Sequence, residues 1–353
     1  MNATDIIRFR LSNQQIANSE FKRPEEILGW FGAMQAQVFA MAKWAFGLRM
    51  KDETEGSIDI LFNEGKILRT HLLRPTWHFV APQDIRWMLA LTAPRVHAVN
   101  KYYYKKFELD SSVFRRANVE IVKMLRGGKT LTRTALNKAL SRAKIKADGL
   151  RLGYIFMQAE LEGIICSGPR TGKQFTYALL DERVPPTKPM HLQDSLAELS
   201  KRYFTSRGPA TMQDFVWWSG LTSKQANEGI ALLDKNFIHE RSGNQDYILN
   251  PASFRNEKKG QTSFLMPDYD EYGISYKDRS ALFKKIQQTA TDVTNVSPYS
   301  HTLIVDGVIS GTWRMIDRKP MEIEVTPFFP MPKMKQQAIA QAVKRYKSFL
   351  APE

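Results

Sequence analysis

Three successive stretches of the sequence each place helical segments ahead of two short strands around a polar turn, and this recurrence is the strongest limit on the fold. The paired strands are expected at 69–73 and 77–80, at 164–166 and 175–178, and at 237–238 and 247–249. Helices followed by such a two-stranded ribbon make a winged-helix pattern. The pattern recurs after about 90 residues in its organisation, without identity of residues. It predicts a mainly α protein with small β ribbons (α+β), built from three tandem winged-helix units.

We place the three units at residues 1–110, 111–185 and 190–255, with a Pro-rich linker at 184–189 before the third. Residues 256–353 differ in character and predict a C-terminal β-hairpin region followed by a terminal helix. Within them, Asp306-Gly307 between two apolar runs is the strongest short hairpin signal in the chain.

Capping and breaking residues set the expected limits of three helices. Pro24 suits the first turn of a helix, where its missing N–H has no partner to lose. Ser57 is expected to cap a helix over 57–68. A further helix opens at Pro82 and is expected to end before Pro94, because proline inside a helix removes a backbone donor.

The chain is strongly basic, and this bears on its partners more than on its fold. Its 51 Lys and Arg against 36 Asp and Glu leave a formal charge of +15, with a pI near 9.7. Such a field attracts phosphate backbones, so nucleic acid is the expected partner. The alternative is a basic protein that is merely soluble, because composition alone is a loose indicator.

The sequence also indicates a compartment. No stretch approaches the roughly 20 apolar residues of a membrane span, and the N-terminus lacks a signal-peptide core. We therefore expect a cytoplasmic, nucleoid-associated protein. One cysteine, Cys166, excludes an intramolecular disulfide and a thiolate metal cluster. Its apolar neighbours predict a small buried hydrophobic residue.

Two uncharged amides, Gln35 and Gln37, stand at the junction of two apolar runs with helical spacing. On a regular helix, residues two apart do not share a face. Both amides can therefore meet one substrate only if the helix ends here or the pair lies in a turn. The alternative is two ordinary polar residues at a helix end, because such short patterns are common.

The first ribbon carries two imidazoles, a guanidinium and an indole around the turn Arg74-Pro75-Thr76. No metal-ligand spacing accompanies His71 and His78, so a zinc site is not expected, and a structural histidine is the alternative for each. Arg74 at an exposed turn could enter a DNA groove or stack on a base. Trp77 could assist it, or could equally belong to the core.

Other polar groups admit two interpretations. Basic residues of the wings and helix starts suit phosphate contact, although each could be a solvated surface charge: they are Arg133, Arg170, Lys173 and Lys224. Two runs, 268–272 and 276–279, concentrate carboxylate, phenol and basic groups that line a pocket or form an ion-paired loop. No phosphate-binding glycine loop, nucleophile elbow or metalloprotease motif is present, so no nucleotide cofactor or metal is expected.

Taken together, these pieces resemble the AlkZ-like bacterial DNA glycosylases. The matching stretches, in the order the family has them, are 34–37, 69–80, 89–95, 268–272, 276–279 and 305–313. The resemblance implies three winged helices forming a C-shaped, positively charged DNA channel. It also implies a Gln-x-Gln catalytic signature that falls on Gln35 and Gln37, where a related branch has Gln-x-Asp.

Two positions depart from the family pattern. Pro75 stands where many relatives have glycine, and proline fixes φ and removes a donor at the ribbon tip. Val38-Phe39 follows the signature where family members often have Asp-Pro. On the resemblance and the residue types, the expected DNA-binding residues are His71, Arg74, Trp77, His78, Arg133, Arg170, Lys173, Lys224, Tyr272, Lys277, Arg279, Trp313 and Arg314.

The resemblance implies a monofunctional glycosylase, acting as a monomer on double-stranded DNA with alkylated bases. The expected reaction hydrolyses the N-glycosidic bond of cationic purines, N7-alkylguanine and N3-alkyladenine, and extends to the unhooking of interstrand crosslinks. An amide is a poor general base, but it can hold a water and stabilise positive charge on the sugar. That suffices when the leaving base is already cationic. The alternatives are a non-catalytic winged-helix regulator or architectural DNA binder, and a scaffold protein that does not bind nucleic acid.

Overall fold

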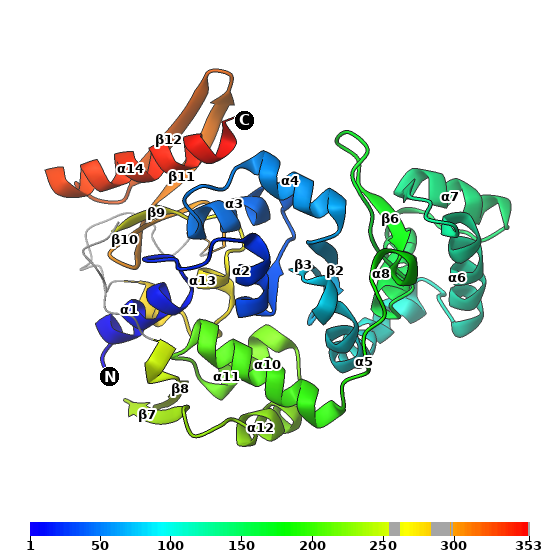
Figure 1. Ribbon diagram of the computed structural model, residues 1–353, viewed down its shortest axis with the longest axis horizontal. Helices are drawn as coiled ribbons and strands as arrows, with labels where there is room; N and C mark the ends of the chain where they lie inside the picture. Colours follow the sequence, from blue (N-terminus) through cyan, green and yellow to red (C-terminus); the bar gives the residue numbers. More distant parts are fainter. Residues whose placement is uncertain (254–261, 284–296, 298, 352–353) are drawn as a thin grey trace. The chain divides into compact units, whose positions relative to one another are not determined.

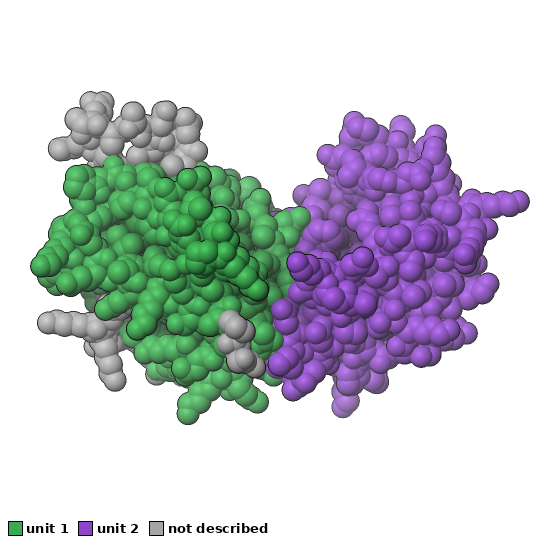
Figure 2. Space-filling view, turned by 90° about the horizontal axis from the view of Figure 1, so that it is seen from above, with its two compact units in different colours: residues 1–58, 197–218, 223–353 green, residues 59–196, 219–222 purple. Residues whose placement is uncertain are grey.

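The computed structural model describes residues 1–253, 262–283, 297 and 299–351, and Figure 1 labels its elements. The chain divides into two compact units, drawn in different colours in Figure 2. Unit 1 comprises residues 1–58, 197–218 and 223–353, and unit 2 comprises residues 59–196 and 219–222. The boundary predicted between residues 255 and 256 lies outside the described residues.

Unit 1 is built from three separated pieces of the chain around an antiparallel four-stranded sheet, with strand order β12-β11-β10-β9. The sheet strands are β9 (Ser263–Leu265), β10 (Thr302–Val305), β11 (Val308–Arg318) and β12 (Met321–Pro327). The other elements are α1 (Ala3–Asn13), α2 (Pro24–Phe31), β1 (Ala33–Gln35), α3 (Phe39–Arg49), most of α11 (Met212–Ser219), α12 (Ser223–Ala231), β7 (Ile238–Ser242), β8 (Gln245–Leu249), η1 (Pro251–Ser253), α13 (Glu271–Ile274), η2 (Ser280–Leu282) and α14 (Lys333–Leu350). Helices α4 (Glu55–Glu64) and α10 (Leu192–Arg207) each cross from one unit to the other.

The hairpin and terminal helix predicted near the C-terminus are both present. Asp306 and Gly307 connect β10 to β11 with φ of 50° and 81°, the left-handed pair that a tight type I′ turn requires. Helix α14 packs on α3 and on the sheet through aromatic rings. The Tyr346 ring lies 4.8 Å from both Trp44 and Trp313, measured between centroids. These buried rings form one part of the core of unit 1.

Unit 2 contains helices and two small antiparallel sheets. Its elements are β2 (Leu68–Leu72), β3 (Thr76–Val80), α5 (Pro82–Lys106), α6 (Ser111–Leu125), β4 (Leu131–Thr132), α7 (Arg133–Arg142), α8 (Gly149–Leu161), β5 (Ile165–Ser167), β6 (Thr176–Leu179) and α9 (Leu180–Arg183). The apolar stripe of α6 joins α7 and α8 in one core that includes Phe114, Ile121, Leu136 and Ile155. The helices and ribbon expected within 111–185 are therefore present.

The limits predicted for two helices are wrong. Helix α5 does not end before Pro94 but continues to Lys106. Pro94 and Ala90, whose carbonyl loses its partner, both lie on the exposed side where water can bind it, while Val96 and Asn100 are buried beyond them. Burial of the residues beyond Pro94 thus outweighs the tendency of proline to end a helix.

Helix α4 spans Glu55–Glu64, so it begins two residues earlier and ends four residues earlier than the predicted helix over 57–68. The Thr54 side-chain oxygen accepts the Ser57 N–H at 3.0 Å, and the Ser57 side-chain oxygen accepts the Thr54 N–H at 3.1 Å. Thr54 is therefore the cap and Ser57 its reciprocal partner. Helix α2, in contrast, begins at Pro24 as predicted.

Two other expectations concern the burial of Cys166 and the absence of a membrane span. Cys166 is fully buried in β5, as predicted, and burial raises the pKa of its thiol to about 12. Among the described residues, no helix is both long enough and apolar enough to cross a membrane.

Candidate functional site

The two glutamines lie in extended and bent backbone between two helices, not on a helix. Gln35 is the last residue of β1, and Gln37 lies two residues before α3. Gln35 ends a strand and Gln37 lies in a bend, so the objection that applies to a helix does not arise. Gln35 is 9% exposed, and Gln37 is exposed. The pair therefore stands at the surface of unit 1, one amide sheltered and the other open to solvent.

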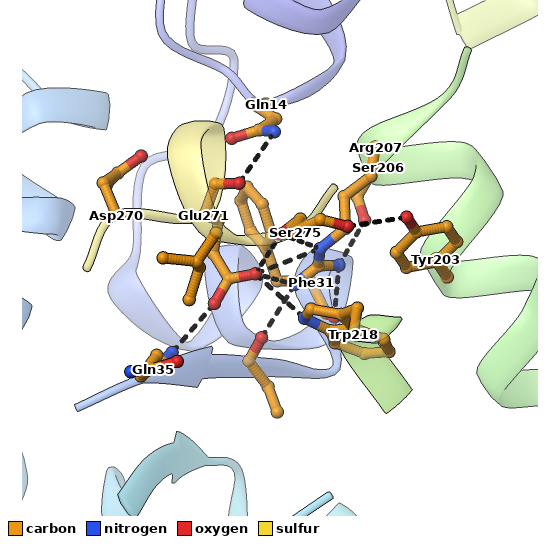
Figure 3. Close-up of polar contacts among 12 residues, drawn as sticks. Gln14, Phe31, Gln35, Tyr203, Ser206, Arg207, Trp218, Asp270, Glu271 and Ser275 are labelled. Carbon is orange, nitrogen blue, oxygen red and sulfur yellow. Dashed lines mark hydrogen bonds and ion pairs between the residues drawn. The ribbon is translucent and has the colours of Figure 1, made fainter. Parts of the chain in front are cut away.

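A buried ion pair fixes the backbone that carries Gln35 (Figure 3). The Arg207 Nη2 atom lies 2.8 Å from Glu271 Oε2, and both side chains are almost completely buried. Arg207 also donates to the carbonyls of Phe31 and Ala33, each at 2.9 Å. The other carboxylate oxygen, Glu271 Oε1, accepts the Gln35 N–H at 2.8 Å. The segment from Phe31 to Gln35 is thus held by the cation at one end and the anion at the other.

The Glu271 carboxylate has further donors, as Figure 3 shows. Trp218 Nε1 donates to Oε2 at 3.0 Å, and the Ser275 hydroxyl donates at 2.5 Å. Burial alone would raise the pKa of Glu271, but Arg207, the Ser275 hydroxyl and the Gln35 N–H together lower it to about 2. The group is therefore ionised at neutral pH, which a buried carboxylate tolerates only with such partners.

A second buried ion pair lies next to the first. Arg49 binds Asp270 through two hydrogen bonds, of 2.8 and 3.0 Å, and donates to the Gln14 carbonyl at 2.9 Å. Gln14 in turn donates to the Tyr276 hydroxyl at 2.9 Å. Of the two interpretations of the run 268–272, the ion-paired loop is the one observed.

The hairpin β2–β3 belongs to unit 2 and places Arg74 and Pro75 at its tip. Pro75 is exposed and Arg74 half-buried. Leu73, buried just before the tip, has φ of 61°, a left-handed conformation that leucine rarely adopts. Gly220 approaches so closely that an added Cβ would lie 2.4 Å from the Leu73 carbonyl oxygen. The close approach of Gly220 thus restricts the backbone of the turn at Leu73.

The remaining hairpin candidates are less accessible than expected. His71 is buried, and its backbone N–H and its ring both contact the Glu160 carboxylate. His78 is completely buried, with Nδ1 3.0 Å from the Thr76 carbonyl. The half-buried Trp77 ring lies between His71 and the Arg69 guanidinium, which is 4.4 Å from its centroid. Both imidazoles are therefore buried and have contacts within the protein.

The other candidates divide by exposure. Tyr272 and Trp313 are buried and donate to the carbonyls of Gly307 and Met266, at 2.7 and 2.9 Å. Arg279 is half-buried beside the Trp217 and Tyr299 rings. The exposed candidates are Arg133, Lys173, Lys224, Lys277 and Arg314, of which Arg314 pairs with Glu324 and Lys224 lies 4.0 Å from Glu228. Arg170 is half-buried and pairs with Asp59 at 3.3 Å.

Sequence reasoning did not identify Arg207 or Trp218 at all, and it treated Glu271 only as one member of an acidic run. Arg207 and Trp218 each lie more than 50 positions before Glu271, so no local spacing connects them to it. An isolated buried arginine has no sequence signal. Among the residues that the structure describes, no three His, Cys, Asp or Glu side chains form a group that could bind a metal ion.

Comparison with known proteins assigns the chain to a family. The family described as "DNA glycosylase AlkZ-like" matches residues 28–349, which include both glutamines and the buried ion pairs. The chain belongs to the AlkZ-like DNA glycosylase family. It is accordingly a DNA glycosylase, an enzyme of DNA repair.

Two individual relatives agree with this assignment. The chain is 22% identical over 349 residues to an interstrand DNA cross-link repair glycosylase from Streptomyces sahachiroi, covering 92% of this chain and 90% of that protein. The solved structure of Streptomyces sahachiroi DNA glycosylase AlkZ superposes with a TM-score of 0.77 at 18% identity, covering 99% and 97% of the two chains. The overall fold is therefore that of an AlkZ-like glycosylase.

Proposed function

We propose that this glycosylase hydrolyses the N-glycosidic bond of cationic alkylated purines in duplex DNA, with Gln35 and Gln37 as its catalytic residues. The observation that carries the proposal is the pair of neutral amides at a surface of unit 1, one of them anchored through its own backbone to the buried Glu271–Arg207 pair. Anchoring limits how far the amide can move, and catalysis depends on such fixed placement.

The chemistry follows from what an amide can and cannot do. A glutamine side chain does not accept a proton at neutral pH, so it cannot act as an ordinary general base. Its carbonyl oxygen can hold the attacking water and face the positive charge that develops on the deoxyribose. N7-alkylguanine and N3-alkyladenine already carry a positive charge and leave without protonation. Undamaged purines lack this activation and are left intact.

The DNA-contacting residues of the proposal are those whose side chains reach solvent. They are Arg74, Trp77, Arg133, Arg170, Lys173, Lys224, Lys277, Arg279 and Arg314. The buried His71, His78, Tyr272 and Trp313 support these surfaces without touching DNA. Three tandem winged helices forming a C-shaped channel stay a prediction that family membership supports.

We include interstrand crosslinks among the proposed substrates. The relative from Streptomyces sahachiroi is named for their repair, and it aligns with most of this chain. A crosslinked base is held by both strands, so it cannot be extruded fully from the duplex as most glycosylase substrates are. A site formed at a surface, by an exposed Gln37 beside a sheltered Gln35, suits a base that stays near the duplex.

The test is single-turnover release of N7-methylguanine from duplex DNA by a Gln35→Ala, Gln37→Ala double variant. Loss of two groups that stabilise the transition state should slow release by about 100-fold or more. A matched variant, Gln83→Ala with Gln245→Ala, removes two exposed glutamines elsewhere and should retain the wild-type rate. Unchanged release by the catalytic double variant would refute the assignment. Duplex binding by the wild type without excision of any alkylated base would favour the non-catalytic regulator.

A further inference from the structure

The positive charge of the chain is concentrated in one short segment. Between Arg95 and Arg151 the sequence has fifteen Lys and Arg against four Asp and Glu, a net charge of +11 out of +15 for the whole chain. This segment comprises the second half of α5, all of α6 and α7, and the start of α8. It contains neither of the catalytic glutamines, which belong to unit 1.

The charges of this segment face solvent. All fifteen side chains except Arg151, which is half-buried, are exposed. Within the part of the chain that the structure describes, none of the fourteen exposed cations forms an ion pair with a carboxylate. In contrast, Arg49 and Arg207 of unit 1 are buried and paired with Asp270 and Glu271. The exposed cations of the segment are therefore accessible to an anionic ligand from solvent.

Helix α6 orders part of this charge into a stripe. Its buried side includes Phe114, Ile121 and Leu125. Its solvent side carries Arg115, Arg116, Val119 and Lys123, and the exposed Arg126 follows as the C-cap. At 1.5 Å per residue, Arg115 and Lys123 are separated by about 12 Å along the helix. Val119, at 64% exposure, lies at the middle of this stripe.

Two open hollows flank Val119. One, of about 250 Å³, is lined by Arg115, Arg116, Val119, Glu120, Ala143 and Ile145. The other, of about 460 Å³, is lined by Asn118, Val119, Val122, Lys123 and Arg126. Each hollow therefore presents at least two cations around a recess, and only the first includes a carboxylate. This arrangement complements a row of phosphates better than it complements a peptide or a lipid chain.

We propose that the solvent face of α6 binds the phosphate backbone of duplex DNA, independently of base sequence and of damage. Arg115, Arg116, Lys123 and Arg126 make the contacts, and the neighbouring exposed lysines of α5 and of the 142–146 stretch extend the field. This surface is additional to the wing and hairpin residues assigned above. Only the choice of DNA as the polyanion rests on the proposed function.

The experiment measures binding of the full chain to an undamaged duplex at several salt concentrations. The α6 variant replaces Arg115, Arg116, Lys123 and Arg126 with glutamine. Each lost phosphate contact should reduce the slope of log K against log salt by about 0.9, so four should reduce it by up to about 3.6. A control variant replaces four exposed lysines outside the stripe and should keep the wild-type slope: Lys51, Lys188, Lys235 and Lys333.

An α6 variant with the wild-type slope for duplex would overturn the proposal, as would a loss confined to an RNA hairpin probe. Thermal unfolding of each variant checks that the exposed substitutions leave the fold intact. Because the duplex carries no lesion, the result does not depend on whether excision occurs. Failure of the glycosylase assignment and failure of this surface are thus separate outcomes.

Discussion

At the scale of residues, the position of Gln35 depends on Glu271. The carboxylate binds the Gln35 N–H and the Arg207 guanidinium in a site with no access to water. In such a site the Glu271 and Arg207 charges stabilise each other, since either one alone would be a buried charge without a counterion. The position of the amide proposed as catalytic thus depends on a charge outside the proposed reaction.

We predict that Glu271→Gln destabilises the protein by about 3–5 kcal/mol at pH 7, because it keeps the shape but leaves Arg207 uncompensated. Urea unfolding measures the loss. The same variant should slow excision, because the Gln35 backbone loses a charged acceptor. Glu322→Gln, at an exposed position, should change neither property. Equal stability of Glu271→Gln and wild type would contradict the role given to the pair.

The stability difference between Glu271→Gln and wild type should also depend on pH. The pKa of Glu271, which burial would raise, is lowered by Arg207 and its other donors to about 2 in the folded protein. The stabilisation is therefore complete above the unfolded pKa of about 4.3, and it is lost as the pH falls toward 2. Unfolding curves at pH 6, 4 and 3 should show the two proteins converging. A constant difference would exclude an ionised Glu271 as its source.

A further prediction at the scale of residues concerns the thiol of Cys166. Burial raises the pKa of its thiol to about 12, and the thiolate is the reactive form. A disulfide reagent at pH 8 should therefore not modify the native protein, and should react with one thiol per chain in denaturant. Rapid reaction of the native protein would show that β5 is accessible.

Residue identity alone predicted some of these properties and not others. The apolar neighbours of Cys166 were enough to predict its burial, and Gln35 and Gln37 were found through a family signature. Tyr272 and Trp313 have the side chains of a DNA-binding surface, yet both are buried in unit 1. Their environment is set by strands and helices distant in sequence, which no local pattern records.

At the scale of elements, local turn chemistry predicted the ribbons well. Asp306-Gly307 gave the β10–β11 hairpin because both residues adopt positive φ readily. The end of α5 was not predictable, because Pro94 acts locally whereas buried residues beyond it act through packing. The tip of β2–β3 is a similar case, since Gly220 holds Leu73 from a distant part of the chain.

We predict that Gly220→Ala destabilises the protein by about 1–3 kcal/mol and displaces the hairpin tip. Gly220 has φ of 71°, and an added Cβ would lie 2.4 Å from a backbone oxygen that cannot easily move. Thermal unfolding measures the loss. Gly29→Ala is the matched control, because nothing lies within 4 Å of its Cβ position in α2 and alanine favours a helix. Equal behaviour of the two variants would argue against the close approach.

At the scale of the whole molecule, unit 1 unites residues that the sequence assigns to separate segments. Arg49, Arg207 and Glu271 come from its three pieces, and buried ion pairs join them. Composition and periodicity can divide a chain into consecutive segments, but they do not indicate which distant segments share a core. The sequence therefore predicted most elements while leaving their assembly undetermined.

We predict that a chain ending at residue 255 does not fold its unit 1, because it lacks Asp270 and Glu271. Arg49 and Arg207 would then be buried without an anion, or would be exposed along with the core around them. Circular dichroism and solubility of the truncated chain measure this. A soluble truncated protein with cooperative unfolding would show that residues 1–255 are self-sufficient.

The separation between Gln35 and the carboxylate that anchors it has a consequence during protein synthesis. Gln35 leaves the ribosome 236 residues before Glu271. Throughout that interval the nascent polypeptide carries Gln35 without the carboxylate that accepts its N–H. On the proposed assignment of Gln35 as a catalytic residue, a chain released from the ribosome before residue 271 should therefore be unable to excise bases.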